Sequence, residues 1–127
     1  MRILLIQSYL GRKEKPLLPL GLAYVATNLN GHEVSIVDPN IVNSPFDSIR
    51  KKLTDFDPEV IGISLRNIDT TLYKDRFYYY KNLVSTVEYI KRIVPDALIV
   101  IGGAAFSLYA EEIMRQNPKI DYGIHLE

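Results

Sequence analysis

The stretch Val60-Ile61-Gly62-Ile63-Ser64-Leu65-Arg66-Asn67 decides the fold, because it is an apolar run that stops abruptly at polar residues. An apolar run without polar alternation is typical of a strand that helices cover on both faces of a parallel sheet. Gly62 inside the run indicates a bulge or the close approach of another group. The segment from Arg66 to Tyr80 is long for an α/β connection, which indicates contact with a ligand or partner.

The remaining sequence alternates between strand and helix patterns. Four more strands are predicted at residues 2–6, 32–38, 98–101 and 121–124. Four helices are predicted at residues 20–29, 45–56, 80–94 and 108–116, the last capped by Ser107. Such alternation predicts one α/β domain. We expect a Rossmann-like (flavodoxin-like) doubly wound parallel sheet of five strands in the order 2-1-3-4-5, within three αβα layers and with strand 32–38 at an edge.

Composition excludes several classes of function. The chain has fifteen basic and fifteen acidic residues, so it lacks the positive charge excess of a nucleic-acid-binding protein. It has no cysteine, which excludes disulfides, thiol catalysis and iron–sulfur ligation by this chain. Its two histidines, His32 and His125, are too few for a histidine metal cluster. No apolar run reaches the roughly 20 residues that cross a bilayer, and no secretory signal is present, so a cytoplasmic location and no membrane partner are expected.

A ligand is expected at the carboxyl ends of the strands, between strands one and three, where the strand order reverses. Neither G-x-G-x-x-G nor a P-loop occurs there. Gln7, Ser8, Ser64 and Leu65 stand where a phosphoacceptor receiver domain would carry acidic residues. The rim loops instead offer small and neutral groups, beside aromatic residues 73 and 77–80, which favours a large neutral cofactor. These small and neutral residues are Gly21, Gly62, Ser64, Gly102, Gly103, Ala104, Ala105 and Ser107.

Five segments together resemble the N-terminal cobalamin-binding domain of radical S-adenosylmethionine (radical SAM) enzymes. They are residues 19–24 (Pro-Leu-Gly-Leu-Ala-Tyr), 31–34, 58–69, 101–107 (Ile-Gly-Gly-Ala-Ala-Phe-Ser) and 111–113. The resemblance covers nearly the whole chain. It implies that the corrin lies on the carboxyl ends of the strands and that the nucleotide tail inserts beside the sheet. It also matches Ser64 and Leu65 to an S-x-L element, and Gly102 and Gly103 to a G-G element, both lining the slot for the tail.

The resemblance implies a binding site without catalytic residues or protein ligands to a metal. The cofactor-binding residues would be Gln7, Ser8, Leu20, Gly21, Gly62, Ser64, Leu65, Arg66, Asn67, Gly102, Gly103, Ala104, Ala105, Phe106 and Ser107. Several of these have a plainer interpretation when taken alone. Ser64-Leu65 can simply end a strand and Gly102-Gly103 can simply form a turn. Residues 78–80, three consecutive tyrosines, fit either a cofactor lid or a contact with another domain.

Two departures from the family pattern shape the expectation. The D-x-H-x-x-G element is absent, since residues 7–18 contain neither Asp nor His, so cobalt would lack a histidine on its lower face. The family continues past the last strand with a G-E-G-E segment and a catalytic domain bearing three cysteines, whereas this sequence ends at Ile124-His125-Leu126-Glu127. We interpret Leu126-Glu127 as an expression linker.

The chain is therefore expected to be a single cobalamin-binding domain, residues 1–127, truncated before the radical SAM domain that would be its partner. The parent protein would be a methyltransferase or cyclase that also uses a [4Fe-4S] cluster and S-adenosylmethionine, neither bound by this chain. By itself the domain would catalyse nothing. The alternative is a receiver-like or protein-interaction domain of the same fold without a cofactor.

Overall fold

The computed structural model describes residues 1–11, 15, 17–70 and 72–126. Five parallel strands form one sheet in the order β2-β1-β3-β4-β5, which confirms the predicted topology and places β2 at an edge. The strands are β1 (Arg2–Gln7), β2 (Glu33–Val37), β3 (Val60–Ser64), β4 (Leu98–Gly102) and β5 (Tyr122–Gly123). The helices are α1 (Leu20–Asn28), the 3-10 helix η1 (Pro39–Ile41), α2 (Pro45–Phe56), α3 (Lys81–Ile93), α4 (Ala104–Leu108) and α5 (Ala110–Gln116).

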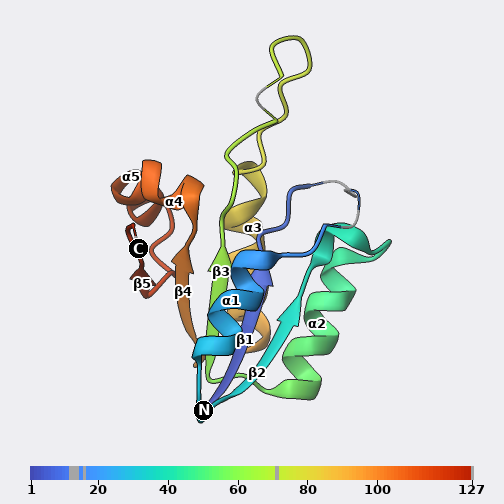
Figure 1. The fold of residues 1–127 in the computed structure, drawn as a ribbon, viewed down its shortest axis with the longest axis vertical. Coiled ribbons are helices and arrows are strands. Elements are labelled where there is room, and N and C mark those ends of the chain that lie inside the picture. Colours follow the sequence, from blue (N-terminus) through green and yellow to red (C-terminus); the bar gives the residue numbers. More distant parts are fainter. Residues whose placement is uncertain (12–14, 16, 71, 127) are drawn as a thin grey trace.

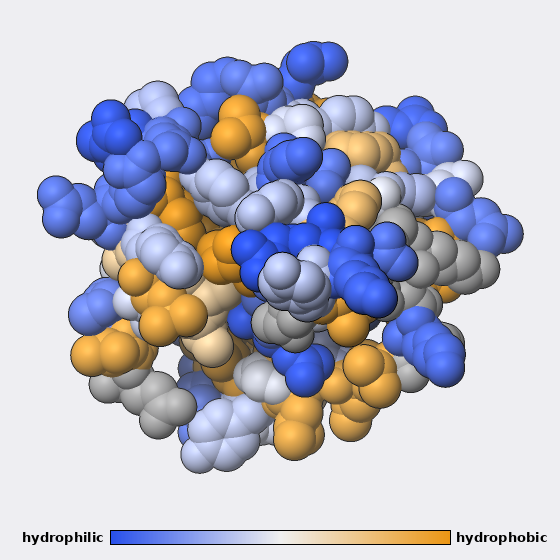
Figure 2. Space-filling model, turned by 90° about the horizontal axis from the view of Figure 1, so that it is seen from above, coloured by the Kyte–Doolittle hydropathy of each residue, from blue (hydrophilic) through white to orange (hydrophobic). Residues whose placement is uncertain are grey.

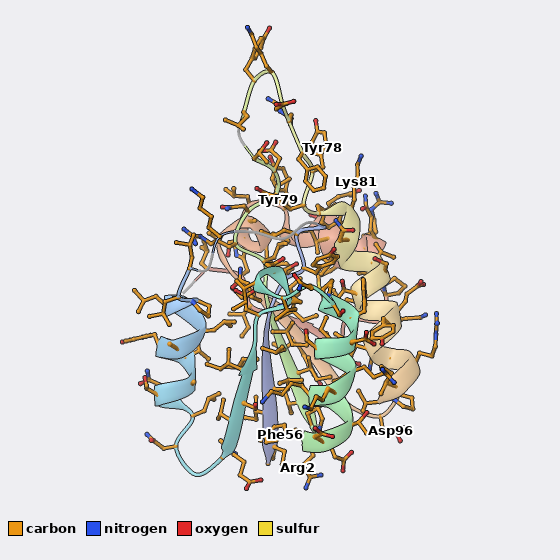
Figure 3. All side chains as sticks on the ribbon, turned by 90° about the vertical axis from the view of Figure 1, so that its right-hand side faces the viewer. Arg2, Phe56, Tyr78, Tyr79, Lys81 and Asp96 are labelled. Atoms are coloured by element: carbon orange, nitrogen blue, oxygen red, sulfur yellow. The ribbon has the colours of Figure 1, made fainter. Side chains whose placement is uncertain are left out.

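The sheet lies between two helical layers, with α1 on one face and α2 and α3 on the other (Figures 1 and 3). The larger core lies on the α3 face, where alternate strand residues such as Ile6, Ile63 and Ile101 pack against the helices. The smaller core lies on the α1 face, where Leu22 of α1 packs with Ile3 and Leu5 of β1. The three-layer α/β architecture follows from this double coverage.

The expectation that helices cover β3 on both faces is met only in part, and the same holds for β4. Ile61 and Ile63 are buried on the α3 face, but Val60, Gly62 and Ser64 on the α1 face are only half-buried. Leu98 of β4, also on the α1 face, is 44% exposed. The reason is that α1 packs against β1 and β2. Among the described residues, no second helix lies beside α1 on that face (Figure 3).

The helix predicted at residues 108–116 begins earlier and is divided in two. Gly103, with a φ of 104°, turns the chain out of β4 directly into α4. Ser107 therefore lies inside a helix and does not cap one; its hydroxyl accepts a hydrogen bond from the Leu126 backbone N–H at 3.0 Å. Tyr109, with a φ of −137°, then separates α4 from α5. Of the two residues interpreted as a linker, Glu127 lies outside the described residues.

The segment between β3 and α3 extends far beyond the carboxyl ends of the strands (Figure 1). Asp69 and Tyr78 form an isolated antiparallel bridge within it, and the Tyr79 N–H donates to the Ile68 carbonyl at 2.8 Å. The long connection predicted from the sequence is thus a hairpin-like projection. Within the described part of the chain, no helix is long and apolar enough to span a bilayer.

Candidate functional site

Backbone pairing brings three of the predicted site residues level at the carboxyl end of the sheet. Gln7 of β1 pairs with Ser64 of β3, and Ser64 pairs with Gly102 of β4. Side chains at these positions project to the α1 face, because Leu5 and Gly62 precede them by two residues in the same register. We call Gln7, Ser64 and Gly102 the rim row.

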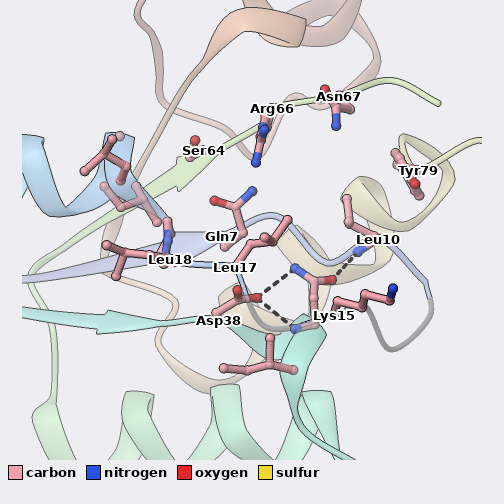
Figure 4. Close-up of a pocket in the computed structure, with 16 residues that line it drawn as sticks. Gln7, Leu10, Lys15, Leu17, Leu18, Asp38, Ser64, Arg66, Asn67 and Tyr79 are labelled. Atoms are coloured by element: carbon pink, nitrogen blue, oxygen red, sulfur yellow. Dashed lines mark hydrogen bonds between the residues drawn. The ribbon is translucent and has the colours of Figure 1, made fainter. Parts of the chain in front are cut away.

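A pocket of about 610 Å³ opens beside this row, where the strand order reverses between β1 and β3. Leucines from the loop after β1 and from the start of α1 form its apolar part, while β1, β3 and the end of β2 contribute polar groups (Figure 4). Seen from above, onto this end of the molecule, apolar side chains gather in patches between hydrophilic ones (Figure 2). The lining residues are Gln7, Leu10, Lys15, Leu17, Leu18, Pro19, Leu20, Gly21, Leu22, Asp38, Asn40, Ile41, Ser64, Arg66, Asn67 and Tyr79.

The pocket collects six of the fifteen predicted site residues. Four of these six have polar side chains that make no hydrogen bond with any residue in the described part of the chain; they are Gln7, Ser64, Arg66 and Asn67. Gly21 is also notable, since a Cβ built there would meet no atom within 4 Å. A packing role for this glycine is therefore excluded, and its backbone is open to a ligand. Leu20 beside it is 70% exposed.

The other nine predicted residues do not line this pocket. Ser8, Leu65, Ala105 and Phe106 are each at most 2% exposed, so their side chains are enclosed by protein. Leu65 lies in the core on the α3 face, opposite to Ser64. The S-x-L spacing would place a leucine two residues after Ser64, where this chain has Arg66, so Leu65 does not occupy the matching position.

Gly62 and the Gly102-Gly103 pair differ in what surrounds them. A Cβ at Gly62 would lie 2.8 Å from Cδ2 of Leu5, so this glycine accommodates a neighbouring side chain. A Cβ at Gly103 would lie 2.6 Å from the Leu65 carbonyl oxygen. A Cβ at Gly102 would meet only Ile124, at an ordinary 3.6 Å. Gly62 and Gly103 thus have structural reasons to be glycine, whereas Gly102 leaves space on the rim row next to Ser64.

Sequence reasoning missed several residues that form the pocket, among them Asp38 and Asn40 at the end of β2. Asp38 stands in a turn before Pro39, and its Oδ1 accepts hydrogen bonds from the Asn40 backbone N–H and Nδ2, both at 2.9 Å. Asn40 is 3% exposed. The sequence signal for both was the Asp38-Pro39-Asn40 turn, which indicates local structure but not a ligand site.

The three consecutive tyrosines separate into three environments. Tyr79 is 7% exposed and lines the pocket. Tyr78 is 43% exposed beside Lys81, whose Nζ lies 5.7 Å from the ring centroid (Figure 3). The Tyr80 hydroxyl donates to Oε1 of Gln116 at 2.8 Å. Only Tyr79 is therefore placed to meet a ligand in the pocket.

Among the described residues that line the pocket, Asp38 is the one acid and there is no histidine. The described residues contain no set of three or more acidic or histidine side chains that could hold a metal ion. The carboxylates whose pKa is held below its ordinary value lie elsewhere. Asp121 owes its lowered pKa to hydrogen bonds from the Ile99 N–H and then from Lys91, and Glu59 owes its lowered pKa to the Arg2 N–H. The leucines and polar groups of the lining suit the pocket to binding a ligand.

An open α/β sheet with a pocket at its switch point, lined by leucines and unpaired polar side chains, defines a small-molecule-binding domain. Comparison with known protein families shows which family of binding domains this chain belongs to. The chain belongs to the B12-binding-domain family, whose model matches residues 9–127. The expectation of a cobalamin-binding domain is thereby confirmed.

A curated relative and two solved structures that this chain resembles are considerably longer than it is. An uncharacterized methyltransferase, PH0819 of Pyrococcus horikoshii, is 31% identical over 104 residues, which are 81% of this chain and 20% of that protein. The chain thus spans about a fifth of this curated relative.

Two solved structures of the radical S-adenosylmethionine methyltransferase TsrM from Kitasatospora setae share the fold. The one with tryptophan substrate and a SAM analogue matches with a TM-score of 0.84 and 22% identity over 97% of this chain and 23% of that chain. The one with cobalamin and a [4Fe-4S] cluster bound matches with a TM-score of 0.78 and 23% identity over 97% and 22%.

Proposed function

We propose that this domain holds cobalamin across the rim pocket as one part of a radical SAM enzyme, a methyltransferase or cyclase. The observation that carries the proposal is the pocket at the switch point, where four polar side chains are left without partners among the described residues. The names of the relatives support the parent class, because PH0819 is described as a methyltransferase and TsrM as a radical SAM methyltransferase. When bound, cobalamin supplies a cobalt centre that can carry an alkyl group.

The residues present fit the cofactor in two respects. Cobalamin presents a broad, largely apolar ring edged with amide groups, and the pocket pairs leucines with amide, hydroxyl and guanidinium groups. Gln7, Ser64 and Asn67 would hydrogen-bond the amides, and Leu17, Leu18 and Leu20 would pack against the ring. Each of these leucines is at least 65% exposed, and covering them with the cofactor would remove their surface from water.

The nucleotide tail would lie along the α1 face of β3 and β4, where coverage by α1 ends. Gly102 supplies open space there, and half-buried Ser64 is its cross-strand neighbour. Buried Leu65, Ala105 and Phe106 would support this wall from the opposite face of the sheet. Their contribution would be to hold the backbone of the slot rather than to touch the cofactor.

Cobalt would receive no histidine from this domain. Neither of the two histidines of the sequence lines the pocket. His32 lies at the opposite end of the sheet, where its Nδ1 is 3.4 Å from the amino group of Met1. His125 is exposed beyond β5. An electron paramagnetic resonance spectrum of the reduced, loaded protein tests this point, since coupling of the cobalt to a nitrogen of the protein would contradict it.

Cobalamin retention tests the binding proposal directly. The protein is mixed with hydroxocobalamin, passed through gel filtration and examined by visible absorbance, and the corrin bands should elute with the protein. Elution without corrin absorbance would favour the cofactor-free interaction domain. For the parent class, the natural gene should encode a three-cysteine cluster downstream of this domain; a gene without one would contradict the radical SAM assignment.

Gly102→Leu tests the position of the slot. A leucine side chain at this site would fill the space beside Ser64, so retention should fall at least tenfold, which corresponds to about 1.4 kcal/mol. Thr54→Leu, on the exposed face of α2 and remote from the rim, is the matched control and should bind like the original chain. Both variants should keep the circular dichroism of the folded domain. Full retention by the Gly102 variant would show that the tail lies elsewhere.

A further inference from the structure

Asn40 is a buried side chain whose hydrogen bonds join two separate parts of the pocket. It lies in η1, immediately after β2, and is 3% exposed. Its Nδ2 donates to the Ser8 carbonyl at 3.0 Å and to Oδ1 of Asp38 at 2.9 Å. Its Oδ1 accepts a hydrogen bond from the Leu10 N–H at 2.8 Å. A buried amide is stable only when paired in this way, so Asn40 has one well-defined orientation.

Apart from Asp38, the groups that Asn40 binds belong to Ser8 and Leu10, among the first residues after β1. The Ser8 N–H is already held by the Ser64 carbonyl at 3.0 Å, which fixes the strand end. Beyond that point, the Leu10 N–H has Asn40 as its partner among the described residues. The chain then continues to Leu17 and Leu18, which line the pocket together with Leu10. Asn40 is therefore the side chain that fixes where this loop leaves the sheet.

Close contacts at Gly11 also restrict the path of the chain just after β1. Gly11, with a φ of 89°, turns the chain just after Leu10. A Cβ at this position would clash with the side-chain amide of Asn82 in α3 and approach the ring of Phe77 to 3.2 Å. The loop thus passes tightly between Asn40 on one side and the start of α3 on the other. Little freedom remains for Leu10 itself.

We propose that Asn40 is a positioning residue of the cofactor pocket. It holds the first residues after β1, from Ser8 to Leu10, where they can receive cobalamin. This inference rests on the proposed function. Asn40 also keeps Asp38 in place, so one amide sets the β1 and β2 sides of the pocket together. Because its partners are mainly backbone groups, the side chains of Gln7 and Ser64 remain available to the ligand.

Asn40→Leu, which keeps the approximate size but removes all the side-chain hydrogen bonds, is the decisive variant. Two quantities are measured: exchange of the Leu10 amide proton by NMR without cofactor, and the Kd for hydroxocobalamin. Protection of the Leu10 amide should fall at least tenfold, and the Kd should rise at least tenfold. The Leu65 amide, bonded to the Gly102 carbonyl at 2.8 Å, should keep its protection and so report that the sheet is intact.

Asn28→Leu, at the exposed carboxyl end of α1, is the control for the same chemical change. It should alter neither the Leu10 exchange nor the Kd. If Asn40→Leu fails to fold, Asn40→Ser leaves room for water and is measured in the same way. Unchanged Leu10 protection, or lost protection with an unchanged Kd, would overturn the inference. If the original chain itself retains no cobalamin, the proposed function fails instead, whatever the Leu10 exchange shows.

Discussion

Replacing Gly103 by alanine should destabilise the fold strongly, although the change adds a single methyl group. The φ of 104° and ψ of 165° at this residue lie in a region almost exclusive to glycine, where other residues cost roughly 1–3 kcal/mol. The new Cβ would lie 2.6 Å from the Leu65 carbonyl oxygen, which also accepts the Ala105 N–H at 3.1 Å. Moving the Leu65 carbonyl away from the new Cβ would weaken its hydrogen bond with the Ala105 N–H, which is worth about 1 kcal/mol. We expect a total loss of about 3 kcal/mol.

The neighbouring Gly102 provides a matched control, because the same substitution there meets no obstacle. Its Cβ would make one ordinary contact, 3.6 Å from Ile124, and its φ is not in the positive region. Gly102→Ala should therefore change stability by no more than about 0.5 kcal/mol. Unfolding in urea followed by circular dichroism measures both variants. A loss of about 3 kcal/mol for the Gly103 variant corresponds to a Tm lowered by roughly 10 °C.

Equal stabilities of the two alanine variants would refute this reasoning. The turn from β4 into α4 would then tolerate a side chain, and the close approach to Leu65 would not be a constraint. A Gly103 variant that is stable but loses cobalamin would also contradict it, since the structure gives this residue a role in the backbone path. We expect the Gly103 variant to lose stability, and to bind cobalamin normally under conditions in which it is folded.

Two further substitutions test contacts that hold the sheet. Asp121→Asn should cost about 1 kcal/mol at pH 7, because the carboxylate accepts hydrogen bonds from the Ile99 N–H and Lys91 at a partly exposed site. These bonds lower the pKa of Asp121 in the folded state, so the stability they give is present above its ordinary pKa of about 4 and is lost as the pH falls below it. Urea titrations at several pH values should show the gap closing in acid; a constant gap would exclude the charge as its cause. Gly62→Ala should cost about 1 kcal/mol, since only the mobile end of Leu5 must move, and a loss above about 3 kcal/mol in the same assay would contradict that packing.

The sequence predicted the sheet correctly because its signals are local. Runs such as residues 98–101 mark strands by composition, and their alternation with helical patterns leaves few possible topologies. The start of α2 at residue 45 was also predicted correctly, since proline favours the first helical turn and the helix begins at Pro45. Each of these features depends on neighbours within a few residues.

Features that depend on distant neighbours were missed. An apolar run such as residues 60–65 indicates burial but does not show how far one helix reaches across a sheet, so the partial coverage of β3 and β4 was not predicted. Asn40 illustrates the same limit. Two of its partners, Ser8 and Leu10, lie about thirty positions away and offer only backbone groups, which any residue type could provide. The hydrogen bonds between Asn40 and these backbone groups therefore could not be predicted from the types of side chain in the sequence.

At the carboxyl end of the sheet, the structure distinguishes residues that stabilise the backbone from residues whose side chains are open to a ligand. The sequence pattern did not separate these two groups. Asn40 and Gly103 have structural roles: the Asn40 amide binds backbone atoms, and Gly103 lies so close to the Leu65 carbonyl that it leaves no room for a Cβ. By contrast, the pocket-lining side chains of Gln7 and Ser64 form no hydrogen bonds with the described residues. Such side chains, on backbone that strand pairing fixes, can bind a ligand without first breaking internal hydrogen bonds. A site with this division of roles is suited to holding a cofactor in a fixed position.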